Sequence, residues 1–347
     1  MVRITDDILY RVEKPSRYVG GELNEVIKDP KEVDIRFGFC FPDVYEVGMS
    51  HLGSRILYHV LNQRKDTYCE RVYAPWPDME KLMRENNIPL YALETKDPIN
   101  EFNFLAFTLQ YEMSYTNILN MLNMGGIPLR ASERTEKDPL VIAGGPCAYN
   151  PEPLYDIVDI FQLGEGEEGL NDLLDLYQKH KDNFNKEAYL REASHIPSVY
   201  IPSLYDVTYN EDGTIKEFIP KYDDVPKKVK KRIINNFDQV DFPESLIVPY
   251  SEIVHDRVVL ELFRGCTNGC RFCQAGMIYR PVREKSRKTL LDQARKMLKA
   301  TGYDEVSLVS LSTCDYSDIQ GLVKDLIEEH GKNNVSVALP SIRVDAF

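Results

Sequence analysis

Strand-like and helix-like segments alternate in two separate series along this chain of 347 residues, and this alternation is the strongest constraint on its fold. From residue 34, short apolar runs are each followed by segments with apolar residues at helical spacing. The same order resumes at residue 256. Strands that alternate with helices predict a mostly parallel sheet covered by helices, and therefore the α/β class.

The first series predicts a doubly wound, Rossmann-like domain over residues 34–180. It follows a polar extension over 1–33 and precedes a connector over 181–254, in which Glu211-Asp212-Gly213 indicates a β-hairpin. Strands are expected within 33–42, 67–75, 89–95, 102–110, 138–146 and 157–163. A helix is expected within 186–195, inside the connector.

The second series, over 255–347, predicts the first three β/α units of a barrel. Its strands are expected within 257–266, 304–312 and 334–342, and its helices within 290–300 and 318–331. In the second helix, the apolar spacing predicts burial of Ile319, Leu322, Val323, Leu326 and Ile327. Three units are too few to close a barrel, so this domain is expected to be incomplete.

Charge and hydropathy narrow the class of protein. The net charge of −13 argues against a non-specific nucleic-acid coat, although basic stretches lie at 227–232 and 280–288. No apolar run is long enough to cross a bilayer, and the start of the chain is not a signal peptide. We therefore expect a cytoplasmic protein without a membrane partner.

Three of the seven cysteines, Cys266, Cys270 and Cys273, lie within eight residues, directly after an expected strand. Cytosolic cysteines clustered in this way indicate metal binding rather than disulfides. Thiolates are the usual ligands of iron–sulfur clusters, and the glycines at 265 and 269 allow a tight loop around one. Three thiolates leave one iron of a four-iron cluster without a protein ligand, and a catalytic metal site requires such an open coordination position.

Two alternatives use the same thiols. One is a zinc knuckle, and the other is an electron-transfer cluster. Either needs a fourth ligand, for which His255, Cys314 and Cys147 are candidates.

The C-x3-C-x2-C loop after a parallel strand resembles the radical S-adenosylmethionine (SAM) superfamily. The resemblance implies a [4Fe–4S] cluster on the three cysteines, SAM on the fourth iron, and reductive SAM cleavage to a 5′-deoxyadenosyl radical. It implies an electron donor such as flavodoxin or ferredoxin. It also implies SAM contacts from Phe272, Ser310, Ser312, Asp315, Ser341 and Arg343.

Two of these side chains have simpler explanations in the sequence. Asp315 is placed to cap the helix that follows it, since aspartate is a favoured N-cap residue. Arg343 is two residues from Asp345 and has the charge to pair with it.

Glycine-rich loops follow three strands of the first domain, at 41–53, 144–153 and 163–169, and a parallel sheet gathers such loops at one edge. The set resembles the cobalamin-binding-type domain that precedes the radical SAM barrel in many members. By that resemblance, the expected cobalamin contacts are Gly48, Ser50, Gly53, Gly144, Gly145, Gly164 and Gly166. The D-x-H-x-x-G signature is absent, so a scaffold or docking role without cobalamin is the alternative.

The longer pattern from 41 to 153 resembles one family of uncharacterised radical SAM proteins, whose members continue beyond residue 347. The chain is therefore expected to be an amino-terminal fragment. The leading hypothesis is a radical SAM enzyme acting on an unknown substrate. The alternatives are a methylthiotransferase-like enzyme that modifies RNA, with the basic segment 277–288 near the RNA, and a non-catalytic metal-binding or interaction module.

Overall fold

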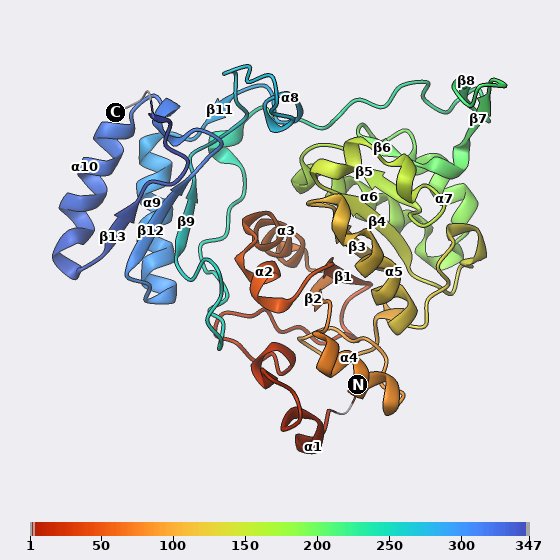
Figure 1. Ribbon diagram of the computed structural model, residues 1–347, viewed down its shortest axis with the longest axis horizontal. Helices are drawn as coiled ribbons and strands as arrows, with labels where there is room; N and C mark the ends of the chain where they lie inside the picture. Colours follow the sequence, from red (N-terminus) through yellow and green to blue (C-terminus); the bar gives the residue numbers. More distant parts are fainter. Residues whose placement is uncertain (1, 3, 345–347) are drawn as a thin grey trace. The chain divides into compact units, whose positions relative to one another are not determined.

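The computed structural model describes residues 2 and 4–344 and is drawn as a ribbon in Figure 1. The chain divides into two compact units, which are described one at a time. The first unit comprises 1–20, 26–48 and 60–233, and the second comprises 21–25, 49–59 and 234–347. The domain boundaries at residues 33, 180 and 254 stay sequence-based predictions.

A six-stranded sheet in the order β2-β1-β3-β4-β5-β6 forms the centre of the first unit. All neighbouring strands are parallel except β5 and β6, which are antiparallel. The strands are β1 (Ile35–Phe41), β2 (Thr67–Tyr73), β3 (Phe104–Thr108), β4 (Leu140–Gly144), β5 (Ile160–Gln162) and β6 (Val199–Tyr200). The α/β class with a parallel-dominated sheet is therefore confirmed.

Helices connect and cover these strands. They are α1 (Asp6–Leu9), α2 (Tyr45–Ser50), α3 (Leu52–Gln63), α4 (Pro77–Glu85), α5 (Tyr115–Met124), α6 (Gly166–His180) and α7 (Lys186–Ala193). The Phe104 ring is fully buried. Its centroid lies 4.9 Å from the centroid of the Tyr177 ring of α6 and 6.4 Å from that of the Tyr189 ring of α7. Both helices therefore pack on the face of the sheet that Phe104 occupies.

The strand expected over 89–95 is wrong. Its bridge is an isolated antiparallel one between Tyr91 and Pro98, and a single hydrogen bond joins the Leu93 N–H to the Arg71 carbonyl of β2 at 2.8 Å. The Ala92 N–H donates to the Asp97 carbonyl at 3.1 Å, so the segment closes a local turn. Backbone groups that are satisfied so near in sequence are not available to a sheet ladder.

The connector contains the expected hairpin, formed by β7 (Tyr205–Tyr209) and β8 (Ile215–Pro220) in antiparallel register. Gly213 lies in its turn with a φ of 81°, a value that glycine adopts at little cost. The helix expected within 186–195 is confirmed as α7. The short strand β6 adds an antiparallel edge to the sheet of the first unit.

The second unit contains a three-stranded parallel sheet in the order β13-β12-β9. Its three strands and two long helices confirm the elements expected for this region. The strands are β9 (Val258–Glu261), β12 (Glu305–Val309) and β13 (Ser336–Ala338), and the helices are α9 (Arg287–Thr301) and α10 (Ile319–His330). Strands β10 (Phe263–Arg264) and β11 (Arg283–Glu284) pair antiparallel, and α8 (Ala275–Ile278) lies between them in sequence.

The expected burial of Ile327 in α10 is wrong, because this side chain is 54% exposed. The fully buried residues of the helix are Leu322 and Leu326, one turn apart. Ile327 is rotated by about 100° from Leu326 around the helix axis. The buried stripe is therefore narrower than the apolar spacing indicates.

Within the part of the chain that the structure describes, no helix is both long enough and apolar enough to span a membrane.

Phe104→Ala is expected to lower the free energy of unfolding by about 3–5 kcal/mol, because it removes an aromatic ring from a fully buried position between β3, α6 and α7. Urea denaturation followed by circular dichroism measures this loss. The control is Tyr155→Ala, which truncates a side chain that is 52% exposed and should change stability by less than about 0.5 kcal/mol. Equal losses in the two variants would contradict the prediction.

Candidate functional site

The three clustered cysteines lie between β10 and α8, in a loop held by the segment that follows α8. Gly265 has a φ of 89°, and a Cβ at this position would overlap the Pro281 carbonyl oxygen. The Arg280 Nε donates to the Cys266 carbonyl oxygen at 3.2 Å. Close backbone approach and this hydrogen bond together fix the first part of the loop, as the paired glycines predict.

All three thiols are free, with Cys270 exposed and Cys266 and Cys273 partly buried. Within residues 2 and 4–344, no set of three or more histidine, cysteine or carboxylate side chains is arranged to hold a single metal ion. The thiolates of a [4Fe–4S] cluster bind different irons, so its ligands do not converge on one point.

Three side chains from three loops meet beside the first cysteine. Asn268 Nδ2 lies 3.4 Å from Cys266 Sγ and 2.8 Å from Asp315 Oδ2. Arg343 Nη1 donates to Asn268 Oδ1 at 2.9 Å and to Asp315 Oδ2 at 2.8 Å. Although partial burial opposes ionisation of Asp315, the Asn268 hydrogen bond and the Arg343 charge hold its pKa below the usual value. The structure thus brings Asp315 and Arg343 together at the cysteine loop.

The expected serines connect the same loops. The Ser310 hydroxyl accepts the Ser312 N–H at 3.2 Å, and the Ser341 carbonyl accepts the Thr313 N–H at 3.3 Å. The first contact lies within the loop after β12, and the second links that loop to the loop after β13. Phe272 is 93% exposed and packs on little of the protein, so its ring is free to meet a ligand.

One simpler explanation of these residues is wrong, and a second lies outside the described residues. Asp315 was a candidate cap for the following helix, yet the N-cap of α10 is Asp318, and the Asp315 carboxylate faces Asn268 and Arg343. The pairing of Arg343 with Asp345 stays a prediction, because Asp345 lies outside the described residues. Among the residues that the structure describes, the Arg343 guanidinium pairs with the Asp315 carboxylate at 2.8 Å.

Asn268 was missed by the sequence analysis. Its only signal was a side-chain amide between two expected metal ligands, and an amide in a glycine-containing loop usually indicates no more than a turn. Its role depends on Asp315 and Arg343, which are 47 and 75 residues away.

The basic stretch at 280–288 is largely engaged within the protein. Lys285 is 1% exposed, and its Nζ lies 3.6 Å from the centroid of the Phe242 ring. Arg287 forms ion pairs with Asp318 at 3.0 Å and Asp325 at 2.5 Å. Binding of RNA phosphates requires accessible cationic side chains, and these two are already engaged within the protein. Lys285 and Arg287 therefore contribute little basic surface for RNA.

The order β2-β1-β3 places a topological switch point at β1 in the first unit, and such points are where α/β sheets bind ligands. The loops after β1 and β3 meet there. Asn117 Nδ2 donates to the Pro42 carbonyl at 2.9 Å, and the Tyr111 hydroxyl donates to the Asp43 carboxylate at 3.1 Å. Tyr111 is 45% exposed, so this edge presents an aromatic ring to solvent.

The expected cobalamin glycines of the later strands lie beyond the carboxyl ends of β4 and β5. Gly144 ends β4, and Gly166 begins α6. Gly145 and Gly164 both have positive φ, and the structure explains each by backbone packing. A Cβ on Gly145 would lie 2.9 Å from the Leu109 carbonyl oxygen, and one on Gly164 would overlap the Arg232 carbonyl oxygen. Protein backbone therefore accounts for these two glycines.

The remaining residues of that set lie on α2 and α3. A Cβ on Gly48 would overlap the Tyr73 ring, so close packing also explains this glycine. The Ser50 hydroxyl accepts the His255 N–H at 3.1 Å, and Gly53 lies against the His51 ring. Ser50 and Gly53 belong to the second unit, whereas Gly48 belongs to the first.

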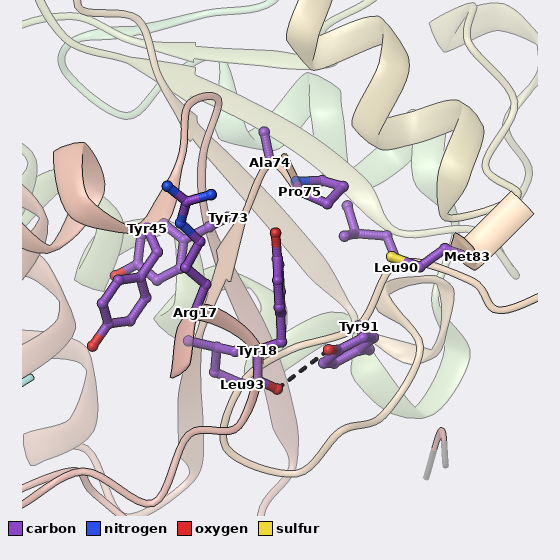
Figure 2. Close-up of a pocket in the computed structure, with 10 residues that line it drawn as sticks. All are labelled: Arg17, Tyr18, Tyr45, Tyr73, Ala74, Pro75, Met83, Leu90, Tyr91 and Leu93. Carbon is purple, nitrogen blue, oxygen red and sulfur yellow. Dashed lines mark hydrogen bonds between the residues drawn. The ribbon is translucent and has the colours of Figure 1, made fainter. Parts of the chain in front are cut away.

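Figure 2 shows a small cavity in the first unit that the sequence did not indicate. It has a volume of about 20 Å³, which is room for about one water molecule. Arg17, which lines the cavity, pairs with Glu46 at 2.9 Å. The Tyr91 hydroxyl donates to the Tyr18 carbonyl at 3.2 Å, as Figure 2 shows. This cavity is too small for SAM or a corrin and belongs to the core packing.

Both units match known families. Residues 53–202 match the family described as radical SAM proteins, N-terminal, and residues 260–346 match the radical SAM superfamily. The second range contains the cysteine loop, Asp315 and Arg343.

Two curated relatives are similar in sequence. An uncharacterised protein of Methanocaldococcus jannaschii is 26% identical over 310 residues, which are 88% of this chain and 55% of that protein. The ribosomal protein uS12 methylthiotransferase RimO of Elusimicrobium minutum is 30% identical over 151 residues, which are 41% of this chain and 32% of that protein. The chain thus spans about half the length of the first relative and a third of the second.

The fold resembles that of TsrM from Kitasatospora setae, a radical SAM methyltransferase solved with cobalamin and a [4Fe–4S] cluster bound. The TM-score is 0.56 at 13% identity, over 91% of this chain and 58% of that one. A second TsrM structure, with tryptophan and a SAM analogue, gives a TM-score of 0.51. This likeness supports the expected combination of a cobalamin-binding-type fold with a radical SAM fold.

Gly265→Ala is expected to destabilise the cysteine loop, because the added methyl overlaps the Pro281 carbonyl oxygen and the backbone holds a positive φ. The matched control is Gly302→Ala, at a φ of 72° with no atom within 4 Å of the added methyl. The free energy of unfolding should fall by about 1 kcal/mol in the control and by at least about 2 kcal/mol in Gly265→Ala. Thermal unfolding of both variants measures this order, and equal losses would contradict it.

Proposed function

We propose that this chain, which carries radical SAM family domains, binds a [4Fe–4S] cluster through Cys266, Cys270 and Cys273. It is proposed to use SAM for radical chemistry on an unknown substrate. The observation that carries the proposal is the meeting of the cysteine loop with Asp315 and Arg343 at the carboxyl ends of β9, β12 and β13. When bound, such a cluster supplies the electron that cleaves SAM.

The residues present fit a cluster of this kind. Three free thiols lie on one short loop, and thiolates are the ligands that iron–sulfur clusters prefer. The exposure of Cys270 leaves the loop open to an incoming cluster. A loop with three thiols also leaves one iron without a protein ligand, where the amino-acid part of SAM is proposed to bind.

Asp315 and Arg343 are suited to the two charges of that amino-acid part. The Asp315 carboxylate is ionised at neutral pH and matches an ammonium group, whereas the Arg343 guanidinium matches a carboxylate. Ser310, Ser312 and Ser341 hold the loops that carry them. The exposed Phe272 ring offers a surface for the adenine.

The electron is proposed to come from a protein donor such as a flavodoxin or ferredoxin. Cys270, as the exposed thiol of the three, marks the side of the loop nearest to solvent. Nucleic acid is not favoured as a partner, because Lys285 and Arg287 in the basic stretch are already paired within the protein.

Cys270→Ala is expected to abolish the cluster after anaerobic reconstitution, since it removes one of three ligands. Iron and sulfide content should fall to background, and the Mössbauer and EPR signals of a [4Fe–4S] cluster should disappear. The matched control is Cys314→Ala, a free and partly buried cysteine outside the loop, which should keep about four irons per chain. A cluster that persists in Cys270→Ala, or zinc in place of iron in the unchanged chain, would refute the proposal.

Cobalamin binding by the first unit is a second proposal, supported by the strand order β2-β1-β3 and its switch point. The TsrM structure that shares this fold has cobalamin bound. The proposed contacts are the loops after β1 and β3, including the exposed Tyr111, together with the loop that begins at Gly144. A scaffold without cobalamin is the alternative.

Hydroxocobalamin mixed with the full chain is expected to remain bound through gel filtration, with its visible absorption bands coeluting with the protein. Tyr111→Ala should weaken binding about tenfold, because it removes a ring from the switch point. Tyr209→Ala, which truncates a 62% exposed side chain of the β7–β8 hairpin, is the control. Free elution of the corrin from the unchanged chain would favour the scaffold alternative.

The methylthiotransferase-like alternative is supported by the 30% identity to RimO, whose name specifies a ribosomal protein. For this chain, that alternative shares the proposed cluster and SAM site and differs in the transferred methylthio group and in the substrate. The name of this relative supports methylthio transfer but specifies a protein rather than RNA.

A further inference from the structure

We propose that Asn268 is a positioning residue that joins the Cys266 sulfur to the Asp315–Arg343 ion pair and thereby raises the reduction potential of the cluster. The inference rests on the proposed function, since it concerns the cluster that the three thiols are proposed to hold. It adds a residue that neither the sequence pattern nor the family matches indicate.

The hydrogen-bond partners of Asn268 dictate how its amide is oriented. Arg343 has only N–H groups to offer, so the atom facing it must be the amide oxygen, at 2.9 Å. Asp315 is an ionised carboxylate and accepts only, so the atom facing it must be the amide nitrogen, at 2.8 Å. An amide nitrogen carries two hydrogens, and the second is available to Cys266 Sγ at 3.4 Å.

This arrangement is built from three separate loops. Asn268 follows β10, Asp315 follows β12, and Arg343 follows β13. The Arg343 guanidinium contacts both Asn268 and Asp315, so the three side chains form a closed triangle. Each polar atom that the amide offers has a partner among Cys266, Asp315 and Arg343. The sulfur therefore faces an N–H group that cannot rotate away without breaking two other hydrogen bonds.

A fixed N–H group beside a thiolate ligand raises the reduction potential of the cluster. Reduction adds one electron, supplied in the test by dithionite, and the added negative charge spreads onto the sulfurs. The positive end of the N–H dipole stabilises that charge more in the reduced form than in the oxidised form. Loss of the Asn268 amide should therefore make the cluster harder to reduce.

The same triangle connects the cluster to the proposed SAM site. An ammonium group at Asp315 and a carboxylate at Arg343 compete for the atoms that now bond Asn268. Binding of a ligand with both groups is therefore expected to alter the hydrogen bond to Cys266. Since coupling between two equilibria is reciprocal, the Asn268 variant should change both the potential and its response to SAM.

The test is an EPR-monitored redox titration of the reconstituted full chain, with and without SAM. Asn268→Ala should lower the ratio of reduced to oxidised cluster about tenfold at a fixed solution potential, a shift of 59 mV for one electron. Asn268→Asp keeps the size and the oxygen that faces Arg343 but has no N–H group, and should shift the potential in the same direction. The matched control is Thr267→Ala, at an exposed neighbouring position in the same loop.

The outcomes separate the two proposals. If the unchanged chain takes up no cluster, the proposed function fails. If the cluster forms in all variants and both Asn268 variants titrate like Thr267→Ala, the proposed function stands and the role of Asn268 is refuted. Loss of cluster from Asn268→Ala, with normal content in Thr267→Ala, supports the positioning of Cys266. A SAM-induced shift of equal size in Asn268→Ala and the unchanged chain refutes the coupling.

Discussion

The parallel pairing of β12 with β9 and β13 is the constraint on which the candidate site depends. Val306 of β12 lies in register with Val258 on one side and with Val337 on the other. Because the three strands run in the same direction, their carboxyl ends open at one edge of the sheet. The loops that contain Asn268 and Asp315 meet at this edge, and an antiparallel strand at either position would remove one of them from the site.

A partly buried ion pair supports the start of the cysteine loop. Glu261, at the end of β9, accepts two hydrogen bonds from Arg264 of β10, at 2.8 and 3.0 Å. Burial raises the pKa of this carboxyl group, but the charge and hydrogen bonds of Arg264, together with the charges of Lys285 and Arg283, outweigh burial, so the pKa lies below the usual value. Lys285 lies over the Phe242 ring in the same region and adds a further positive charge. Removal of one member would leave a partly buried charge without its partner beneath the loop.

Periodicity predicted most of the elements because the strands and helices of each series bury an apolar face within their own unit. It failed where the local pattern did not decide the partner. The 89–95 segment has the apolar composition of a strand, yet its backbone closes a turn through Ala92 and Asp97. Ile327 has the spacing of a buried helical residue, yet the helix buries only the Leu322–Leu326 stripe fully. In both cases the packing of neighbouring segments overrode an ambiguous local signal.

The sequence by itself determined the chemistry that is available: three thiols at a spacing suited to one cluster, and glycines where the backbone turns tightly. The tertiary structure alone decided which distant groups surround them. It joined Asn268 to Asp315 and Arg343 across 47 and 75 residues, and it placed the Arg232 backbone against Gly164. The physical reason is that ligand type and backbone freedom are properties of single residues, whereas a hydrogen-bond network exists only once separate strands have aligned.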